Sequence, residues 1–223
     1  LMLAMQTLVG PGDRVVAVTP LWPNLTAIPA LLGATLEPVS LTVKDGRWWL
    51  DLDRLLAALT ASTRLLILNS PANPTGWVIS DEQIAAIREH CRRRGIWVLA
   101  DEAYERLAFD RERATSFLDG SDDGDRLIIA NTFSKTWCMT GFRVGWLTLP
   151  AALIGQVEKL VEFNTSCVPV FVQRAAQAAI ATGEAPIRDL RLMVTDGTRH
   201  LTRALRALPG VTVVEPEGAM YLM

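Results

Sequence analysis

The sequence predicts an α/β fold, with a doubly wound, mostly parallel sheet followed by the start of a smaller α+β domain. Short β-rich runs alternate with helical patterns over the first 150 residues, as expected when helices cover both faces of a sheet. Several of the runs are apolar throughout, which is typical of strands buried on both faces. After Pro150 the alternation stops and long helical patterns take over.

Six runs are expected to form strands, and TLEPV has the weakest β character among them. The crossovers between parallel strands are right-handed, so the carboxyl ends of the strands share one edge, where such folds bind ligands. The runs are RVVAV (14–18), TLEPV (35–39), RLLILN (64–69), IWVLA (96–100), RLIIAN (126–131) and VGWLTL (144–149).

Helix signals separate these runs. Ser80 opens a capping box with Gln83, and Gly95 ends that helix after three arginines. Residues 51–60 predict a second helix with acidic residues in its first turn. The apolar start, residues 1–13, lacks a basic region and a cleavage site, so we interpret it as an amphipathic helix and not as a signal peptide.

The pattern beyond Pro150 is mostly helical. Residues 151–181 predict helix with an interruption at Pro169, residues 185–208 predict another helix, and residues 210–223 predict strand, turn and strand. We therefore expect three parts: a large α/β domain, the helices that connect it to the next domain, and an incomplete small α+β domain. Their boundaries are 1–150, 151–182 and 183–223.

The composition excludes several classes of function. Half of the 223 residues are hydrophobic and the net charge is −2, so the chain has no basic footprint for nucleic acid or a membrane surface. No apolar run is long enough to span a bilayer. Cys91, Cys138 and Cys167 are far apart and form no metal-binding pattern with histidine, so we expect no metal and a reducing, cytoplasmic setting.

Four unusual clusters follow four of the expected strands. Because parallel strands end at one edge, we expect all four to converge, and this convergence is the main functional signal of the sequence. The clusters are TPLWPN (19–24), NSPANPTG (69–76), DEAY (101–104) and NTFSKTWCMTGFRVGW (131–146).

Each polar residue in these clusters also has an ordinary structural explanation. Asp101 suits a helix N-cap, and Asn73 suits a turn. Tyr104 and Trp22 suit packing, Lys135 suits a solvated surface, and Arg143 could pair with a surface acid. Taken together, these explanations require several independent coincidences at one edge of the sheet.

One chemistry uses all of these residue types. A lysine with a lowered pKa forms Schiff bases with carbonyl groups. A carboxylate can keep a pyridinium nitrogen protonated, an arginine beside hydroxyls can bind a phosphate, and an aromatic ring can stack on a flat ring. A binding site with these four kinds of side chain suits pyridoxal 5'-phosphate.

Three motifs carry a resemblance to a known family: NPTG at 73–76, D-E-x-Y at 101–104, and S-K-x₇-R-x-G with Lys135, Arg143 and Gly145. At these residues the chain resembles the class I/II aminotransferases, which are pyridoxal-phosphate enzymes of fold type I in the aspartate aminotransferase superfamily. The resemblance implies the large domain of that fold over most of the chain.

The resemblance also implies roles around the cofactor ring. Lys135 would form the Schiff base and then act as general base and acid. Asp101 would pair with the pyridinium nitrogen. Asn73 and Tyr104 would hydrogen-bond the phenolic oxygen, and Trp22 would stack on the ring.

For the cofactor phosphate, the resemblance implies Thr132, Ser134 and Arg143. It also makes the Asn73–Pro74 peptide a candidate cis bond. The implied partners are an amino acid and a 2-oxo acid, with no nucleic acid or membrane, in a homodimer whose active site lies at the interface.

The implied reaction is transfer of an amino group from an amino acid to a 2-oxo acid. Two alternatives stay open at this point. The same residues serve other enzymes of the fold, such as C–S lyases and decarboxylases. An aminotransferase-like domain can also act as the sensor of a transcriptional regulator.

The family pattern extends beyond both ends of this sequence. Its main phosphate loop would precede residue 1, and its arginine for the substrate carboxylate would follow residue 223. We therefore expect residues 1–223 by themselves to bind the cofactor weakly and to transaminate poorly.

Overall fold

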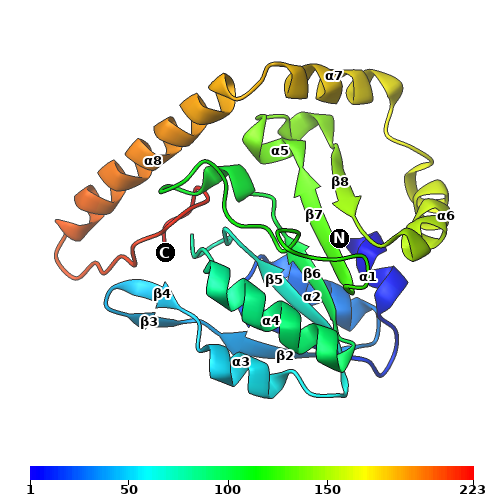
Figure 1. Cartoon of the computed structure of the whole chain (residues 1–223). Helices are drawn as coiled ribbons and strands as arrows, with labels where there is room; N and C mark the ends of the chain where they lie inside the picture. The colour runs from blue at the N-terminus through cyan, green and yellow to red at the C-terminus, as the bar shows by residue number, and fades with distance from the viewer.

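The computed structural model describes residues 1–223, and its centre is a six-stranded sheet in the order β2-β1-β5-β6-β7-β8 (Figure 1). All neighbouring strands are parallel except β7 and β8, which are antiparallel. The prediction of a mostly parallel sheet is confirmed, and all six expected strands are present. Their bounds are β1 (Arg14–Thr19), β2 (Thr35–Ser40), β5 (Thr63–Asn69), β6 (Trp97–Asp101), β7 (Leu127–Thr132) and β8 (Gly145–Thr148).

Helices cover both faces of this sheet. Val16 and Val98 contribute to the core beneath α3 and α4, whereas Val15 and Leu99 contribute to the core beneath α1 and α2. Successive strand residues thus enter opposite cores, which is why the strands are apolar throughout. The helices are α1 (Met2–Leu8), α2 (Pro23–Leu31), α3 (Leu52–Ala58) and α4 (Asp81–Arg94).

The predicted capping box fixes the start of α4. The Ser80 hydroxyl accepts a hydrogen bond from the Gln83 amide, and the Gln83 side chain accepts one from the Ser80 amide, both at 3.2 Å. Gly95 ends the helix in the left-handed conformation, with φ of 66°. The sequence therefore defines both ends of this helix.

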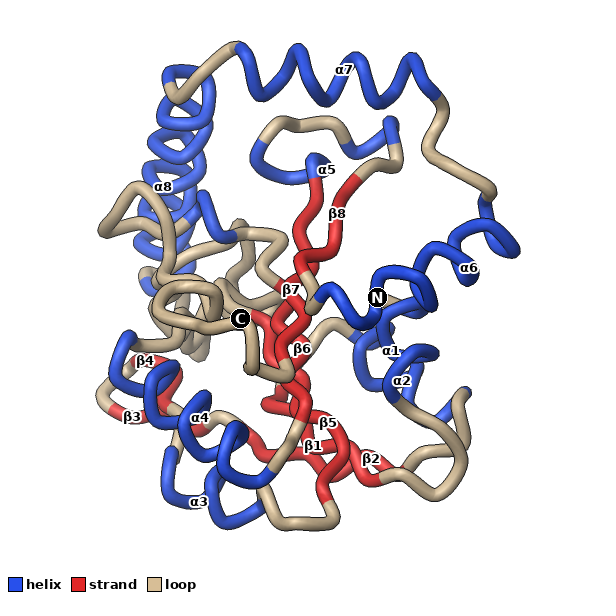
Figure 2. The backbone as a smooth tube through the Cα atoms, turned by 45° about the vertical axis from the view of Figure 1, so that its right-hand side comes forward, coloured by secondary structure: helices blue, strands red, loops and turns tan.

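The helical part after Pro150 also agrees with the prediction. It contains a short 3₁₀ turn, η3 (Ala151–Leu153), then α6 (Ile154–Thr165), α7 (Val170–Ala181) and α8 (Ala185–Arg206). The helical structure is interrupted between α6 and α7, and Pro169 is the N-cap of α7. Both views show α7 and α8 at the outside of the molecule, away from the strands (Figures 1 and 2). No helix combines the length and the apolar character needed to cross a membrane.

The prediction of strand, turn and strand over 210–223 is wrong. This segment forms no strand and makes only two isolated bridges, Arg47 with Glu215 and Ala108 with Gly218. Its ends do approach each other, because the Val214 amide donates to the Met223 carbonyl at 3.1 Å. Most of its other backbone hydrogen bonds join it to segments elsewhere in the chain, so residues 210–223 do not pair with one another as two strands.

Apart from helical turns of three or four residues, two features had no counterpart in the sequence analysis. One is α2, which begins at the Pro23 of the TPLWPN cluster. The other is a hairpin of β3 (Thr42–Lys44) and β4 (Arg47–Trp49), whose turn places Asp45 and Gly46 at positive φ. An Asp-Gly pair between short β-rich runs is the signal that would have predicted the hairpin.

Candidate active site

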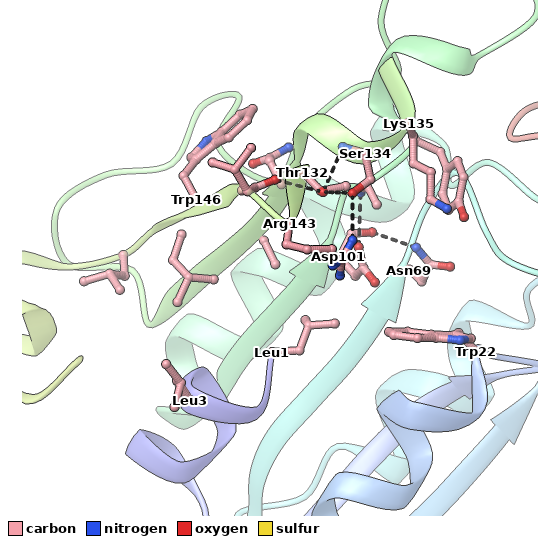
Figure 3. A pocket seen from close by; sticks show the side chains of 18 of the residues that line it. Leu1, Leu3, Trp22, Asn69, Asp101, Thr132, Ser134, Lys135, Arg143 and Trp146 are labelled. Atoms are coloured by element: carbon pink, nitrogen blue, oxygen red, sulfur yellow. Dashed lines mark hydrogen bonds between the residues drawn. The ribbon is translucent and has the colours of Figure 1, made fainter. Parts of the chain in front are cut away.

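The four clusters meet at one cavity, as expected. The cavity has a volume of about 800 Å³ and lies at the carboxyl ends of β1, β5, β6 and β7. Figure 3 shows several of its polar side chains gathered at these strand ends. All eight residues that the sequence singled out line it: Trp22, Asn73, Asp101, Tyr104, Thr132, Ser134, Lys135 and Arg143.

Lys135 reaches the cavity from a short helix, α5 (Phe133–Thr136), directly after β7. Thr132 caps the helix by accepting a hydrogen bond from the Ser134 amide at 3.1 Å. The Lys135 Nζ atom lies 5.5 Å from the centre of the Tyr104 ring. Lys135 forms no ion pair, so its amine has no carboxylate partner that would hold it away from the cavity.

Asp101 is the last residue of β6, between β5 and β7, and its side chain is buried at the floor of the cavity. Its Oδ1 atom accepts a hydrogen bond from the Ala103 amide at 3.1 Å. Burial raises the pKa of Asp101 to about 6, although the Ala103 amide, the amino group of Leu1 and Lys135 act in the opposite direction. Asp101 forms no ion pair, so this buried carboxylate can accept a cationic partner that enters the cavity.

A second polar group gathers beside α5. The Thr132 hydroxyl lies 3.0 Å from the Ser134 hydroxyl, and an Arg143 guanidinium nitrogen lies 3.4 Å from the same Ser134 oxygen. That nitrogen also donates to the Thr140 carbonyl at 2.8 Å. Arg143 has φ of 54°, an unfavourable backbone region for a residue with a side chain. Two hydroxyls and a guanidinium that has no carboxylate partner form a suitable site for a phosphate.

The loop after β5 carries Asn73 and is held by a residue that the sequence analysis missed. The buried Asn69 side chain donates to the Asp101 carbonyl at 2.9 Å and accepts from the Asn73 amide at 2.7 Å. The Asn73–Pro74 peptide is cis, as the resemblance implied. A buried asparagine at the end of an apolar strand was the available signal for Asn69.

Three aromatic residues, Trp22, Tyr104 and Tyr221, also line the cavity, and the sequence analysis did not single out Tyr221. In the view of Figure 3, Trp22 lies below Asn69, and Lys135 lies above it. Tyr104 follows β6, and burial raises its pKa above the ordinary range. Its hydroxyl contacts the hydroxyl of Tyr221, which also lines the cavity. Nothing in the local sequence around Tyr221 indicates this contact.

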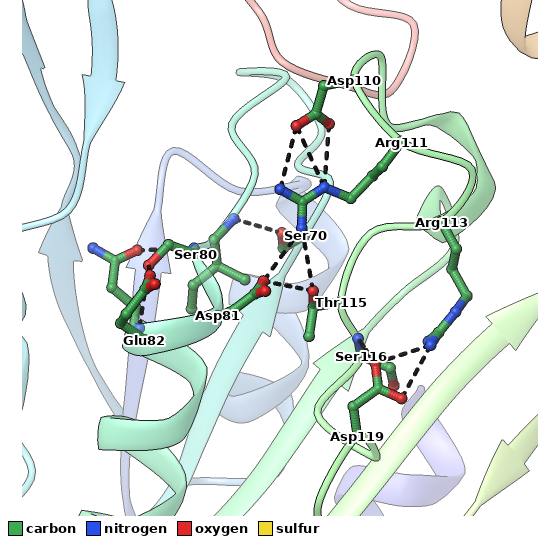
Figure 4. Close-up of polar contacts among 12 residues, drawn as sticks. Ser70, Ser80, Asp81, Glu82, Asp110, Arg111, Arg113, Thr115, Ser116 and Asp119 are labelled. Carbon is green, nitrogen blue, oxygen red and sulfur yellow. Dashed lines mark hydrogen bonds and ion pairs between the residues drawn. The ribbon is translucent and has the colours of Figure 1, made fainter.

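The residue after Asp101 points to the other side of the strand. Glu102 is buried, and its Oε1 atom accepts a hydrogen bond from the Phe117 amide at 2.8 Å. Burial raises the pKa of Glu102 to about 7. The loop that carries Phe117 is fixed by ion pairs of Arg111 with Asp81 and of Arg113 with Asp119 (Figure 4). Glu102 therefore fixes the end of β6 from outside the cavity.

The rest of the cavity wall is largely apolar and was not expected from the sequence. It consists of side chains on or directly after β8, on α6 and near the start of the chain, among them Leu3, Leu147, Leu149, Ile154, Val157 and Val161.

The fold and this cavity define a class of enzymes that hold a cofactor at the carboxyl ends of parallel strands. The sequence model of the family "aminotransferase class I and II" matches residues 1–223. The chain belongs to this family.

Individual relatives agree with this assignment. The chain is 33% identical over 223 residues to an arginine–pyruvate transaminase from Pseudomonas aeruginosa, covering 98% of this chain and 55% of that protein. It is 29% identical over 222 residues to an aspartate aminotransferase from Musicola paradisiaca, covering 100% of this chain and 55% of that protein. The chain thus spans about half the length of these curated relatives.

Solved structures show the same fold. The N-succinyldiaminopimelate aminotransferase from Mycobacterium tuberculosis superposes with a TM-score of 0.89 at 32% identity, covering 98% of this chain and 56% of that one. An aspartate aminotransferase from Thermotoga maritima gives a TM-score of 0.87 at 30% identity, covering 98% and 56%.

Members of this family use pyridoxal phosphate, and the cavity residues fit this group. Asp101 is a buried carboxylate without a cationic partner, which suits a protonated ring nitrogen. Arg143 and the two neighbouring hydroxyls suit a phosphate, and the amine of Lys135 suits an aldehyde.

Proposed function

We propose that the complete protein is a pyridoxal-phosphate-dependent aminotransferase that moves an amino group between an amino acid and a 2-oxo acid. One observation carries the proposal: an amine without a carboxylate partner, Lys135, lines the same cavity as a buried carboxylate without a cationic partner, Asp101. The relatives named above are aminotransferases or transaminases, which supports amino transfer over the other reactions of this fold.

When bound, pyridoxal phosphate supplies an aldehyde for the amino group and a ring that accepts electrons from the substrate carbon. Lys135 holds the aldehyde end and carries a proton to and from the substrate carbon. Asp101 holds the proton on the ring nitrogen, because a nearby negative charge favours the protonated ring. Lys135 and Asp101 are the central catalytic residues.

The remaining residues orient the cofactor. Asn73 and Tyr104 donate hydrogen bonds to its phenolic oxygen, and through that contact Tyr104 is also assigned a catalytic role. Trp22 packs against the ring. The phosphate is held by Thr132, Ser134 and Arg143.

The proposed domain organisation assigns residues 1–150 to a large cofactor-binding domain. Both large apolar cores consist of residues within this range. Residues 151–182 connect it to a small domain that begins with residues 183–223. The supporting observation is that few apolar side chains beyond residue 150 are buried, namely Val172, Ala176, Ile187, Val213 and Ala219.

We also propose that the enzyme is a cytoplasmic homodimer. Large apolar side chains on α6 and α7 are exposed, including Phe163 at 83% and Phe171 at 73%, and a second copy would remove them from water. Analytical ultracentrifugation of the complete protein tests this proposal, and a monomeric mass at micromolar concentration would contradict it.

The activity is tested by comparing two lysines. The chain contains three lysines, and Lys44 is exposed on the hairpin of β3 and β4, outside α6 and α7. After incubation with pyridoxal phosphate and borohydride, the complete protein should carry the cofactor covalently. Lys135→Ala should abolish this attachment and the transfer of an amino group to a 2-oxo acid, and Lys44→Ala should change neither. Attachment that survives Lys135→Ala overturns the role of Lys135.

A further inference from the structure

Tyr104 and Tyr221 meet inside the cavity although they are far apart in the sequence. Their hydroxyl oxygens are 2.5 Å apart, and their rings pack edge to face, with centroids 5.6 Å apart and an angle of 81° between planes. Both rings line the cavity together with Lys135. The contact therefore joins the segment near residue 221 to the proposed catalytic residues.

The backbone near Tyr221 is fixed by the walls of the site. The amides of Glu217 and Gly218 donate to the Gly76 carbonyl at 2.9 and 3.0 Å, and the Ala219 amide donates to the Leu107 carbonyl at 3.0 Å. Gly76 ends the NPTG motif, and Leu107 closely follows Tyr104. The segment is thus held by the two loops that carry Asn73 and Tyr104.

The packing between these segments leaves no room for adjustment. Gly76 has φ of +68°, and a Cβ atom there would lie 2.4 Å from the Cβ of Pro216. A Cβ on Gly218 would lie 2.9 Å from the Cβ of Pro71. Close packing of this kind fixes the backbone just before Tyr221, whose ring packs edge to face on Tyr104.

One hydrogen bond joins the two hydroxyls, and either hydroxyl can be its donor. Burial raises the pKa of Tyr104, so Tyr104 keeps its proton near neutral pH. When Tyr104 donates to Tyr221, its proton is not available to another group in the cavity. When Tyr221 donates to Tyr104, the Tyr104 proton is free to point into the cavity.

We propose that Tyr221 is a positioning residue that controls the hydroxyl of Tyr104. It accepts the Tyr104 proton when the cavity holds no anionic oxygen, and it reverses its own hydroxyl to donate to Tyr104 when Tyr104 donates to such an oxygen. This inference rests on the proposed function, because the anionic oxygen is that of the pyridoxal phosphate held at Lys135.

The reversal keeps every hydroxyl paired in both states. A chain of hydrogen bonds in one direction also polarises its members, so Tyr104 becomes a stronger donor when Tyr221 donates to it. A contact that served only packing would need the Tyr221 ring but not its oxygen.

Tyr221→Phe removes the oxygen and keeps the ring. Met220→Leu is the matched control, because Met220 is adjacent, 41% exposed and outside the cavity wall. Two quantities are measured in the complete protein: the titration of Tyr104 without cofactor, by NMR of ring-labelled tyrosine assigned with Tyr104→Phe, and the dissociation constant of pyridoxal phosphate.

In Tyr221→Phe, the pKa of Tyr104 should rise, because Tyr221 can no longer reverse its hydroxyl and donate to the ionised Tyr104 oxygen. The affinity for pyridoxal phosphate should fall by about twofold at most, because the hydrogen bond of the pair exists with and without cofactor and only its polarising effect on Tyr104 is lost. Met220→Leu should leave both quantities unchanged. In a Tyr104→Phe background, Tyr221→Phe should cause no further loss of affinity.

An unchanged titration of Tyr104, or an equal loss of affinity with and without the Tyr104 hydroxyl, overturns the inference. Failure of the proposed function gives a different result: the unaltered protein would not bind pyridoxal phosphate through Lys135. The titration of Tyr104 is measured without cofactor, so it reports on the tyrosine pair in either case.

Discussion

The side chain of Asn69 donates a hydrogen bond of 2.9 Å to the backbone carbonyl of Asp101 on the neighbouring strand. The same side chain accepts a hydrogen bond from the Asn73 amide. One buried amide thus sets the distance between the floor of the cavity and the loop that carries Asn73. Four predictions follow from this arrangement and from the charges around it.

Asn69→Ala should destabilise the protein and weaken pyridoxal phosphate binding together. The Asn73 amide would lose its acceptor, and an unsatisfied buried donor costs about 1–3 kcal/mol. Chemical denaturation and cofactor titration measure the two effects. Asn164→Ala, at an exposed position of α6, is the control and should have little effect on either. Wild-type stability in Asn69→Ala would contradict the role of this bridge.

Asp101→Asn should raise the stability of the cofactor-free protein and weaken its binding of pyridoxal phosphate. The pKa of Asp101 in the folded protein is about 6, above the ordinary aspartate value, so the folded state binds the proton more tightly than the unfolded chain. Its contribution to the free energy of unfolding is therefore present at low pH and is lost as the pH rises through about 6. At about pH 8, Asp101→Asn should stabilise the cofactor-free protein by roughly 1–3 kcal/mol.

The same substitution should weaken pyridoxal phosphate binding, because asparagine offers no charge to the ring nitrogen. Denaturant titrations at about pH 5 and about pH 8 measure the stability, and the gain at about pH 5 should be roughly half of the gain at about pH 8. Unchanged cofactor affinity in Asp101→Asn would remove Asp101 from the site.

Glu102→Gln should raise stability without affecting binding. The pKa of Glu102 is raised to about 7 by burial, so its contribution to stability is likewise lost as the pH rises through about 7. Glutamine can still accept from the Phe117 amide and carries no charge, so a gain of roughly 1–3 kcal/mol is expected at about pH 8 and little at about pH 5. Since Glu102 does not line the cavity, the affinity for pyridoxal phosphate should stay unchanged. A variant with the same pH profile of stability as the parent protein would refute the charge argument.

Arg143→Gln should weaken binding only for the phosphorylated form of the cofactor. The guanidinium lies beside the Ser134 hydroxyl and forms no ion pair, so its charge is available to a phosphate. Hydrogen bonds to charged groups are strong enough for a loss of about 10- to 100-fold in affinity for pyridoxal phosphate. The affinity for pyridoxal, which lacks the phosphate, should hardly change.

Arg54→Gln is the control for Arg143→Gln, because Arg54 is exposed on α3 and lies outside the cavity wall. It should leave both affinities unchanged. Equal losses for pyridoxal and pyridoxal phosphate in Arg143→Gln would show that Arg143 does not bind the phosphate.

The sequence by itself determined the elements and the polar groups at their ends. Apolar runs such as RLLILN specify strands that are buried on both faces, and the Ser80 capping box and Gly95 specify both ends of α4. Because parallel strands end at one edge, the residues that follow β1, β5, β6 and β7 had to meet. These are local signals combined with one rule of topology, so they could be recognised without coordinates.

The tertiary structure alone decided which distant segments complete the site. Residues 210–223 were expected to form strand, turn and strand, but most of their hydrogen-bonded amides donate to the carbonyls of Gly46, Gly76 and Leu107, and one bond, from Val214 to Met223, lies within the segment. This binding places Tyr221 on Tyr104, and the register of β5 against β6 places Asn69 on Asp101. The physical reason is that a backbone amide bonds with any carbonyl that packing brings near, and packing between distant segments depends on the whole chain.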